Sequence, residues 1–391
     1  MDRCDVVVAG CGIHGAGVAQ AAAAAGHRVL VIEKGEIAGG TSSRSSKLIH
    51  GGLRYLETAQ FSLVRESLRE RSILTRIAPD LVRLRDFFLP VYRTTRRRPW
   101  QLRLGLALYA ALGGFRAAAA FGSLPRREWE SLDGLRLEGL EAVIRYRDGQ
   151  TDDRKLTVAV ARSAERLGAE VALGAELLAV ELREKGCVVM FRQGGAERTC
   201  EASVLVNAAG PWARAIASRV SPPIPSPEVE LVQGAHILLP ATIRRGVYYV
   251  ESPRDGRAVF VMPNDRGVLV GTTETAFRGD PDSVRASPAE RHYLLSVARH
   301  YFPGLAFDPS EILDETAGLR VLPAGQGHAF HRRRESLLIE DRGRLPRVLS
   351  IYGGKLTTYR STALKALRRL SPSLPGRRPV ADTALLPLRA E

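Results

Sequence analysis

Residues 4–26, CDVVVAGCGIHGAGVAQAAAAAG, decide the fold of the N-terminal part of the chain. The stretch begins with a short apolar run that is typical of a buried strand, and its alanine-rich second half favours a helix. Residues 28–32, RVLVI, predict a second strand, which Glu33 ends. The junction between the first strand and the helix carries a GxGxxG pattern, formed by Gly10, Gly12 and Gly15.

This pattern and Glu33 together predict a dinucleotide site. Glycines allow the backbone to turn tightly and to approach a pyrophosphate, whose charge is favoured at the N-terminus of a helix. Glu33 lies at roughly the 20-residue distance at which an acidic residue binds the ribose of the dinucleotide. Its carboxylate can accept hydrogen bonds from a ribose diol, and it would repel a 2′-phosphate.

Two later stretches indicate which dinucleotide is bound. NAAGPWA at residues 207–213 and GGKLTTYR at residues 353–360 each follow a short apolar strand. A nicotinamide-dependent dehydrogenase does not need these returns to the nucleotide-binding unit, whereas a flavoprotein encloses its ring system with late segments of the chain. The sequence contains a single GxGxxG fingerprint, which argues against one unit for FAD and another for NAD(P)H. We therefore predict FAD.

The order of the predicted elements indicates an α/β fold with two interleaved domains. A Rossmann-like FAD-binding domain is predicted from residues 1–60, 145–220 and 335–375. An α+β substrate and membrane-facing domain, built on a mixed antiparallel sheet, is predicted from residues 61–144 and 221–334. Helical periodicity is present over residues 60–92, and residues 376–391 are predicted to be an extended tail.

Several longer motifs resemble those of the FAD-dependent glycerol-3-phosphate dehydrogenases, a family of the D-amino-acid-oxidase-like flavoproteins. The resemblance is collinear from residue 5 to about residue 372. Besides the glycine fingerprint, it is carried by TSSRSSKLIHGGLRYL (41–56), GAHI (234–237), GTTET (271–275), GLRVLP (318–323) and SIYGGKLTTYR (350–360). It implies an FAD-binding fold of the glutathione-reductase and D-amino-acid-oxidase type.

The resemblance also implies which residues bind FAD. The serine-rich loop would follow the pyrophosphate and the flavin ring, Leu177 would offer its backbone to the adenine, and residues 354–357 would approach the pyrimidine edge of the flavin. A helix that begins after Gly354 would aim its N–H groups at negative charge on that edge. Besides the three glycines and Glu33, the implied residues are Thr41, Ser42, Ser46, Leu48, His50, Leu177, Asn207, Gly210, Gly354, Lys355, Leu356 and Thr357.

A substrate site is implied by the same resemblance, with Arg54, Tyr55, His236, Arg320 and Lys355 as its members. Arginine forks bind phosphate, and lysine adds a point charge. His236 is expected to take a hydroxyl proton while hydride passes to flavin N5. From the residues alone, a hydrogen-bonded core histidine at 236 and a surface arginine at 320 are preferred.

The implied reaction is the oxidation of sn-glycerol 3-phosphate to dihydroxyacetone phosphate, with quinone as the electron acceptor. Two alternatives remain: an FAD-dependent oxidase or dehydrogenase of another anionic 2-hydroxy acid or D-amino acid, with oxygen as acceptor, and a flavin-binding protein without turnover. The family's GTTD and GVRPL read GTTE and GLRVL here, so that Glu274 and Val321 leave the exact substrate open. Family members usually continue into a C-terminal helical domain, before which this sequence ends.

A membrane-binding segment is a further expectation. RTTRRRPWQLRLGLALYAAL at residues 93–112 places several arginines before Trp100 and an apolar stretch. One helical face would contain Leu104, Leu108, Ala111 and Leu112. Basic residues, an interfacial tryptophan and a short apolar helix suit insertion into one leaflet, and a packed core helix is the competing interpretation. The resemblance favours the membrane.

Composition limits the remaining classes of function. The net charge of +15 comes almost entirely from arginine, which is scattered along the sequence without a nucleic-acid recognition module, so nucleic-acid binding is not expected. The four cysteines lack metal-binding spacing and are expected to be reduced and buried, and we expect no metal. The N-terminus lacks a signal peptide, which predicts a cytoplasmic protein at the inner face of the cell membrane. A homodimer remains open.

Overall fold

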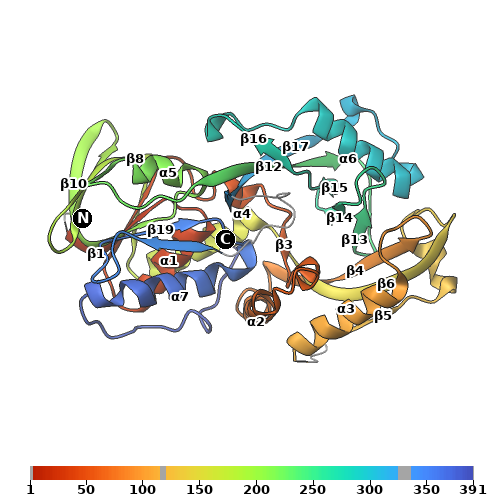
Figure 1. Ribbon diagram of the computed structural model, residues 1–391, viewed down its shortest axis with the longest axis horizontal. Helices are drawn as coiled ribbons and strands as arrows, with labels where there is room; N and C mark the ends of the chain where they lie inside the picture. Colours follow the sequence, from red (N-terminus) through yellow and green to blue (C-terminus); the bar gives the residue numbers. More distant parts are fainter. Residues whose placement is uncertain (1–2, 115–119, 325–335, 391) are drawn as a thin grey trace.

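The computed structural model describes residues 3–114, 120–324 and 336–390, and Figure 1 shows two lobes, each built around a β-sheet. In these residues the first sheet has nine strands, with the path β11–β8–β9–β10–β1–β2–β7, while β19 pairs with β10 and β18 with β19. Its strands are β1 (Arg3–Ala9), β2 (Val29–Glu33), β7 (Glu170–Leu173), β8 (Ala175–Leu182), β9 (Cys187–Gln193), β10 (Ala196–Asn207), β11 (Val220–Ser221), β18 (Leu337–Glu340) and β19 (Val348–Tyr352).

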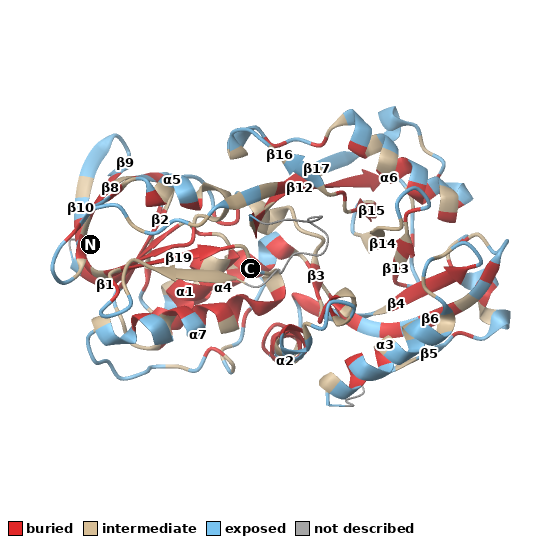
Figure 2. Cartoon of the chain, viewed as in Figure 1, coloured by how far each residue is buried: buried red, intermediate tan, exposed pale blue. Residues whose placement is uncertain are grey.

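The centre of this sheet is the predicted nucleotide-binding unit. Strand β1 runs parallel to both β2 and β10, and β10 runs parallel to β19. Helix α1 (Ile13–Ala24) is buried along nearly its whole length, as Figure 2 shows, because it packs between the sheet, α4 (Asp153–Arg166) and α7 (Tyr359–Leu370). Small residues permit this packing: a Cβ at Gly17 would lie 2.6 Å from the ring of Tyr359. Short α5 (Ala213–Ala217) follows β10.

The second sheet has ten strands in the described residues, with the path β16–β12–β15–β14–β13–β4–β6–β3, while β17 pairs with β12 and β5 with β6. Helix α6 (Pro288–Tyr301) shares one apolar core with this sheet, and α2 (Phe61–Ile77) and α3 (Pro99–Leu112) share another. The strands are β3 (Leu48–Ile49), β4 (Val82–Tyr92), β5 (Phe121–Ser123), β6 (Leu140–Thr151), β12 (Val229–Leu239), β13 (Val247–Glu251), β14 (Ala258–Asn264), β15 (Gly267–Gly271), β16 (Thr275–Phe277) and β17 (Asp314–Pro323).

Two features of the second sheet differ from the sequence-based expectation. The helical periodicity assigned to residues 60–92 holds only as far as Ile77, because residues 82–92 form strand β4 and pair with β6 along their length. The apolar run FFLPVY is buried in the sheet rather than along one stripe of a helix. The domain boundary predicted at residue 145 falls inside β6, and β3 joins the second sheet from within the serine-rich stretch. That stretch therefore passes from one sheet to the other.

The tail after α7 lies against the first lobe. Residues 376–390 form neither helix nor strand, and Val380 N donates to Ala24 O at 2.8 Å. Leu388 N donates to Ile77 O at 2.7 Å, and the Leu388 side chain is buried in the core around α1. The four cysteines are free and buried, as expected.

Candidate active site

Residues from both sheets line one cavity with a volume of about 780 Å³. All five members of the predicted substrate site line it. Among the predicted FAD-binding residues, the lining contains Gly10, Gly12, Glu33, Thr41, Ser42, Ser46, Leu48, His50, Leu177, Gly210, Gly354, Lys355, Leu356 and Thr357. Gly15 and Asn207 are not part of it.

Both exceptions support the cavity wall from behind. A Cβ at Gly15 would lie 1.9 Å from Gly10 O, so this glycine allows α1 to start directly against the turn. Asn207 is fully buried, and its Nδ2 donates to Ala213 O at 2.8 Å. Its Oδ1 accepts from Ala209 N at 3.3 Å, which shapes the turn that lines the cavity.

The dinucleotide end of the cavity is built from backbone and short side chains. Gly10 has φ of +96°, and a Cβ there would lie 2.9 Å from Ala208 O. Glu33 is held at the end of β2, because it accepts from Cys11 N at 2.6 Å and from Gly35 N at 2.9 Å. Ser42 Oγ accepts from Ile13 N at 2.9 Å, which brings the serine-rich loop to the N-terminus of α1. A pyrophosphate and its ribose fit this cradle.

Contacts at the adenine end were not anticipated from the sequence. The Leu177 carbonyl accepts from the Arg219 guanidinium, so that this part of the expected adenine contact already has a partner. Lys34 Nζ contacts Asp282 at 2.8 Å and lies 4.2 Å from the centre of the Trp212 ring. Lys34 follows a strand of the first sheet, and Asp282 lies in a 3₁₀ turn, Pro281–Ser283, of the second lobe. The pair therefore links the lobes beside the cavity.

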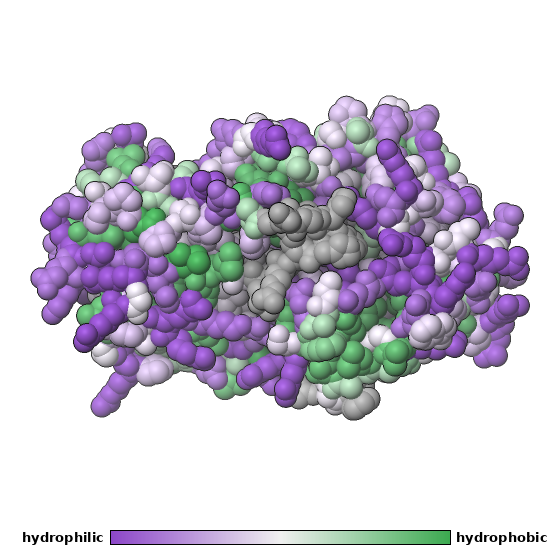
Figure 3. Space-filling model, viewed as in Figure 1, coloured by the Kyte–Doolittle hydropathy of each residue, from purple (hydrophilic) through white to green (hydrophobic). Residues whose placement is uncertain are grey.

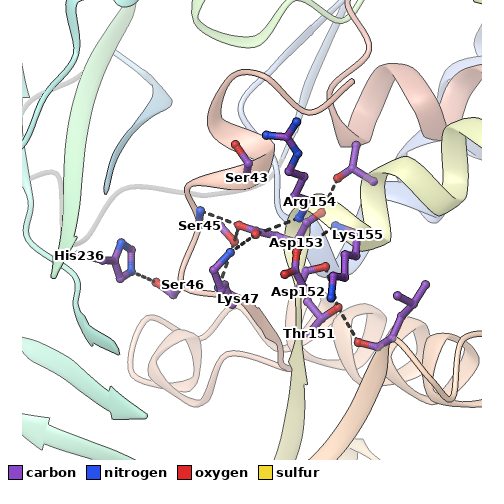
Figure 4. A network of polar contacts seen from close by, with 12 residues as sticks. Ser43, Ser45, Ser46, Lys47, Thr151, Asp152, Asp153, Arg154, Lys155 and His236 are labelled. Atoms are coloured by element: carbon purple, nitrogen blue, oxygen red, sulfur yellow. Dashed lines mark hydrogen bonds and ion pairs between the residues drawn. The ribbon is translucent and has the colours of Figure 1, made fainter. Parts of the chain in front are cut away.

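A buried aspartate organises the serine-rich loop, as Figure 4 shows. Asp153 has a fully buried side chain that pairs with Lys47 and accepts from Ser45 N at 2.8 Å and from Ser45 Oγ at 2.7 Å. Its neighbour Asp152 accepts from Lys155 N at 2.9 Å and so caps the N-terminus of α4. Asp153 instead fixes the loop of residues 41–50, most of which line the cavity.

Cationic and aromatic side chains meet among the residues that are predicted to bind the substrate. Lys355 Nζ lies 3.7 Å from the centre of the Tyr55 ring, and the Arg54 guanidinium lies 5.6 Å from the same ring. Gly52, with φ of +80°, makes room for that ring, because a Cβ would lie 2.2 Å from it. His50 N donates to Thr357 Oγ1 at 3.1 Å, which joins the two stretches that are predicted to contact the flavin. Two cationic side chains of the cavity lining therefore lie beside one aromatic ring.

His236 is a buried, neutral member of the lining. Its Nε2 lies 3.1 Å from Ser46 Oγ, which Figure 4 also shows. Burial lowers the pKa of His236 to about 3, with smaller contributions from Arg320 and Lys47. His14 also lines the cavity. Burial lowers its pKa to about 4, and a Cβ at Gly354 would lie 2.3 Å from its Nε2. Both imidazoles are neutral near pH 7 and can accept a proton.

Arg320 is joined by a second arginine that sequence reasoning missed. Arg320 Nη2 donates to Thr272 Oγ1 at 3.0 Å, and Nη1 lies 3.5 Å from Glu274 Oε1. Arg257 Nη2 lies 3.2 Å from Glu274 Oε2, and all three of these charged residues line the cavity. No motif or spacing relates Arg257 to Arg320. Across the described residues, no group of three or more His, Cys, Asp or Glu could hold a metal ion.

Comparisons with known proteins agree with this architecture. The family described as FAD-dependent oxidoreductase matches residues 5–360. The glycerol-3-phosphate dehydrogenase of Pseudomonas aeruginosa is 39% identical over 98% of this chain and 74% of its own length. The D-erythritol 1-phosphate dehydrogenase of Brucella abortus is 35% identical over 96% of this chain and 75% of its own length.

A solved structure extends the similarity to the cofactor. The glycerol-3-phosphate dehydrogenase of Bacillus halodurans, complexed with FAD, superposes with a TM-score of 0.76 at 25% identity. The match covers 99% of this chain and 68% of that one. The chain therefore belongs to the FAD-dependent oxidoreductase family, in the group of the glycerol-3-phosphate dehydrogenases, and is a flavoenzyme with FAD as its cofactor.

Proposed function

We propose that this flavoenzyme oxidises sn-glycerol 3-phosphate to dihydroxyacetone phosphate. The observation that supports this substrate best is that Arg54, Arg320 and Lys355 line the same cavity as the neutral imidazole of His236, with Arg320 near enough to contribute to the low pKa of that imidazole. A phosphate monoester requires such charge, and an alcohol requires a proton acceptor next to it. Two of the three relatives described above are glycerol-3-phosphate dehydrogenases, and the third is a dehydrogenase of D-erythritol 1-phosphate, which is also a phosphate monoester.

Side chains of the protein bind the substrate and accept its proton, and the cofactor accepts the hydride. Bound FAD supplies the acceptor for the hydride that leaves the alcohol carbon. The three cationic side chains hold the phosphate and so orient the rest of the substrate. His236 Nε2 takes the hydroxyl proton as the C=O bond forms, after the substrate hydroxyl has replaced Ser46 Oγ, which lies 3.1 Å from this nitrogen. An anionic substrate beside the ring favours the imidazolium, which offsets the effect of burial on its pKa.

Anaerobic mixing with sn-glycerol 3-phosphate tests the reaction. The proposal predicts bleaching of the flavin absorbance and formation of one dihydroxyacetone phosphate per flavin. Bleaching by D-amino acids or 2-hydroxy acids alone would assign the enzyme to the oxidase-like alternative. Bound FAD that no donor reduces would indicate a flavin-binding protein without turnover.

The proposed acceptor is quinone, reached by peripheral association with the inner face of the cell membrane. Helix α3 supports this, because Trp100 and Leu104 are 63% and 66% exposed while Leu106, Tyr109 and Ala110 on its other side are buried. Figure 3 shows an apolar patch over α3, with hydrophilic residues around it. A leaflet-inserted helix has this arrangement. None of the described helices is long and apolar enough to cross a bilayer.

Replacing Trp100 and Leu104 by serine is expected to weaken binding to vesicles that contain phosphatidylglycerol by at least tenfold, since each loses an apolar side chain worth about 1.5–3 kcal/mol when buried. Co-sedimentation measures this, and turnover with a soluble dye should be retained. Leu385→Ser, at an exposed leucine in the tail, is the matched control. Equal vesicle binding by both variants would rule out α3 as the membrane contact.

A separate experiment identifies the electron acceptor. It compares how fast a short-chain quinone and oxygen reoxidise the reduced flavin.

A further inference from the structure

Glu274 joins two arginines at the wall of the cavity. Its Oε2 lies 3.2 Å from Arg257 Nη2, and its backbone carbonyl accepts from Arg257 Nη1 at 3.2 Å. Its Oε1 lies 3.5 Å from Arg320 Nη1. Arg257 immediately precedes β14 and Arg320 lies in β17, so two separate strands present their guanidinium groups to one carboxylate. The two guanidinium groups are therefore neighbours.

The three side chains differ in how far they are exposed. The Glu274 side chain is 6% exposed, whereas those of Arg257 and Arg320 are each 24% exposed. All three side chains line the cavity, and the carboxylate is the most buried of them, so the two guanidinium groups are more accessible to an anion. A guanidinium carries five N–H donors, and the contacts of Arg257 with Glu274 use two of its nitrogens, Nη1 and Nη2. Arg257 can therefore hold Glu274 and an anion in the cavity at the same time.

The position of Arg320 is fixed by its surroundings. Its Nη2 donates to Thr272 Oγ1, and a Cβ at Gly234 would lie 2.6 Å from that nitrogen. Because strand β12 offers only a glycine here, the Arg320 head lies directly against the strand. Glu274 then sets the distance from Arg320 to Arg257. Because Glu274 contacts both guanidinium groups, it helps to determine where the second one lies.

We propose that Arg257 is a second guanidinium of the substrate's phosphate site and that Glu274 positions it beside Arg320. A single carboxylate is bound well by one arginine fork, whereas a phosphate monoester has three terminal oxygens and a charge of about −1.5 to −2. Two adjacent guanidinium groups match the phosphate and exceed what a carboxylate needs. The inference deepens the proposed function and rests on it for the identity of the substrate.

Arg257→Met tests the proposal, with two probes: sn-glycerol 3-phosphate in anaerobic flavin bleaching and inorganic phosphate in titration calorimetry. We expect both dissociation constants to rise roughly 10- to 100-fold, because one charge-assisted contact with the anion is lost. FAD content and the bleaching rate at saturation should change much less. Arg266→Met is the control, because Arg266 pairs with Asp314 on the surface of the same lobe. Arg257→Lys should recover part of the affinity.

Glu274→Gln tests the positioning role. The amide keeps the size of the side chain and loses the charge that both guanidinium groups share, so affinity for both probes should fall about tenfold while FAD remains bound. If Arg257→Met binds both probes as tightly as Arg266→Met does, or if the wild type binds no phosphate, the inference is wrong. A wild type that binds phosphate through Arg257 but is not bleached by sn-glycerol 3-phosphate keeps the anion site and rejects the proposed substrate.

Discussion

Asp153→Asn is expected to weaken FAD binding strongly. It should also lower the free energy of unfolding by about 3–5 kcal/mol, which is the usual result of removing one partner of a buried ion pair. The asparagine retains the volume of the side chain and removes its charge. Lys47, whose side chain is only 22% exposed, then lacks its counter-charge, and Ser45 loses a charged acceptor for two hydrogen bonds. The loop of residues 41–50 carries much of the cofactor lining, so its disorder should appear first as loss of FAD.

The measurement is the FAD dissociation constant, from flavin fluorescence, together with the thermal midpoint of the apoprotein and holoprotein. Asp152→Asn is a closely matched control: it lies one residue away, and asparagine caps a helix about as well as aspartate. The double variant Asp153→Asn, Lys47→Met should lose less stability than the two single variants lose together, because it also removes the Lys47 charge that lacks a partner in Asp153→Asn. Equal FAD affinity in Asp153→Asn and Asp152→Asn would show that the ion pair does not organise the loop.

The nucleotide-binding unit could be predicted from the sequence because its signals are local. The glycine fingerprint, the alanine-rich helix and Glu33 lie within one short segment, and each has a direct structural consequence there. Strand β4 was missed because its pairing partner β6 lies in a distant part of the chain, and the apolar spacing before it suits a helix. Pairing between distant segments overrides such local periodicity.

The less predictable parts of the site depend on contacts between distant residues. Lys34 and Asp282 are 248 positions apart, and Lys47 and Asp153 are 106 apart, yet both pairs are in contact. Nothing in the sequence near Arg257 distinguishes it from the many other arginines, and only the folded second sheet brings it to Glu274. The family motifs indicated Arg54, Lys355 and Arg320, and the fold brings these to one cavity. Their individual roles stay predictions.

Lys355→Met is expected to slow reduction of the flavin by sn-glycerol 3-phosphate by about 10²- to 10³-fold at saturating substrate, the range for removal of one preorganised charge. Lys355 precedes the 3₁₀ turn Leu356–Thr358, which leads into α7, and the Tyr55 ring lies 3.7 Å from its ammonium group. This charge is therefore held in place before substrate arrives. Methionine keeps the length and apolar character of the stem, so FAD should remain bound, and stopped-flow absorbance measures the rate.

Substitutions of Tyr55 test whether Lys355 acts because its charge is held in position or only because it makes the cavity cationic. Tyr55→Phe keeps an aromatic face beneath the ammonium group and should retain most of the rate, whereas Tyr55→Leu removes a cation–π contact worth about 0.5–2 kcal/mol. Lys365→Met is the control, because Lys365 pairs with Glu66 at the protein surface. If Lys355→Met lost only substrate affinity while reduction at saturation stayed at the wild-type rate, Lys355 would bind phosphate and would not act on the reacting groups. If Tyr55→Phe and Tyr55→Leu were equally slow, the phenol hydroxyl rather than the ring would carry the effect.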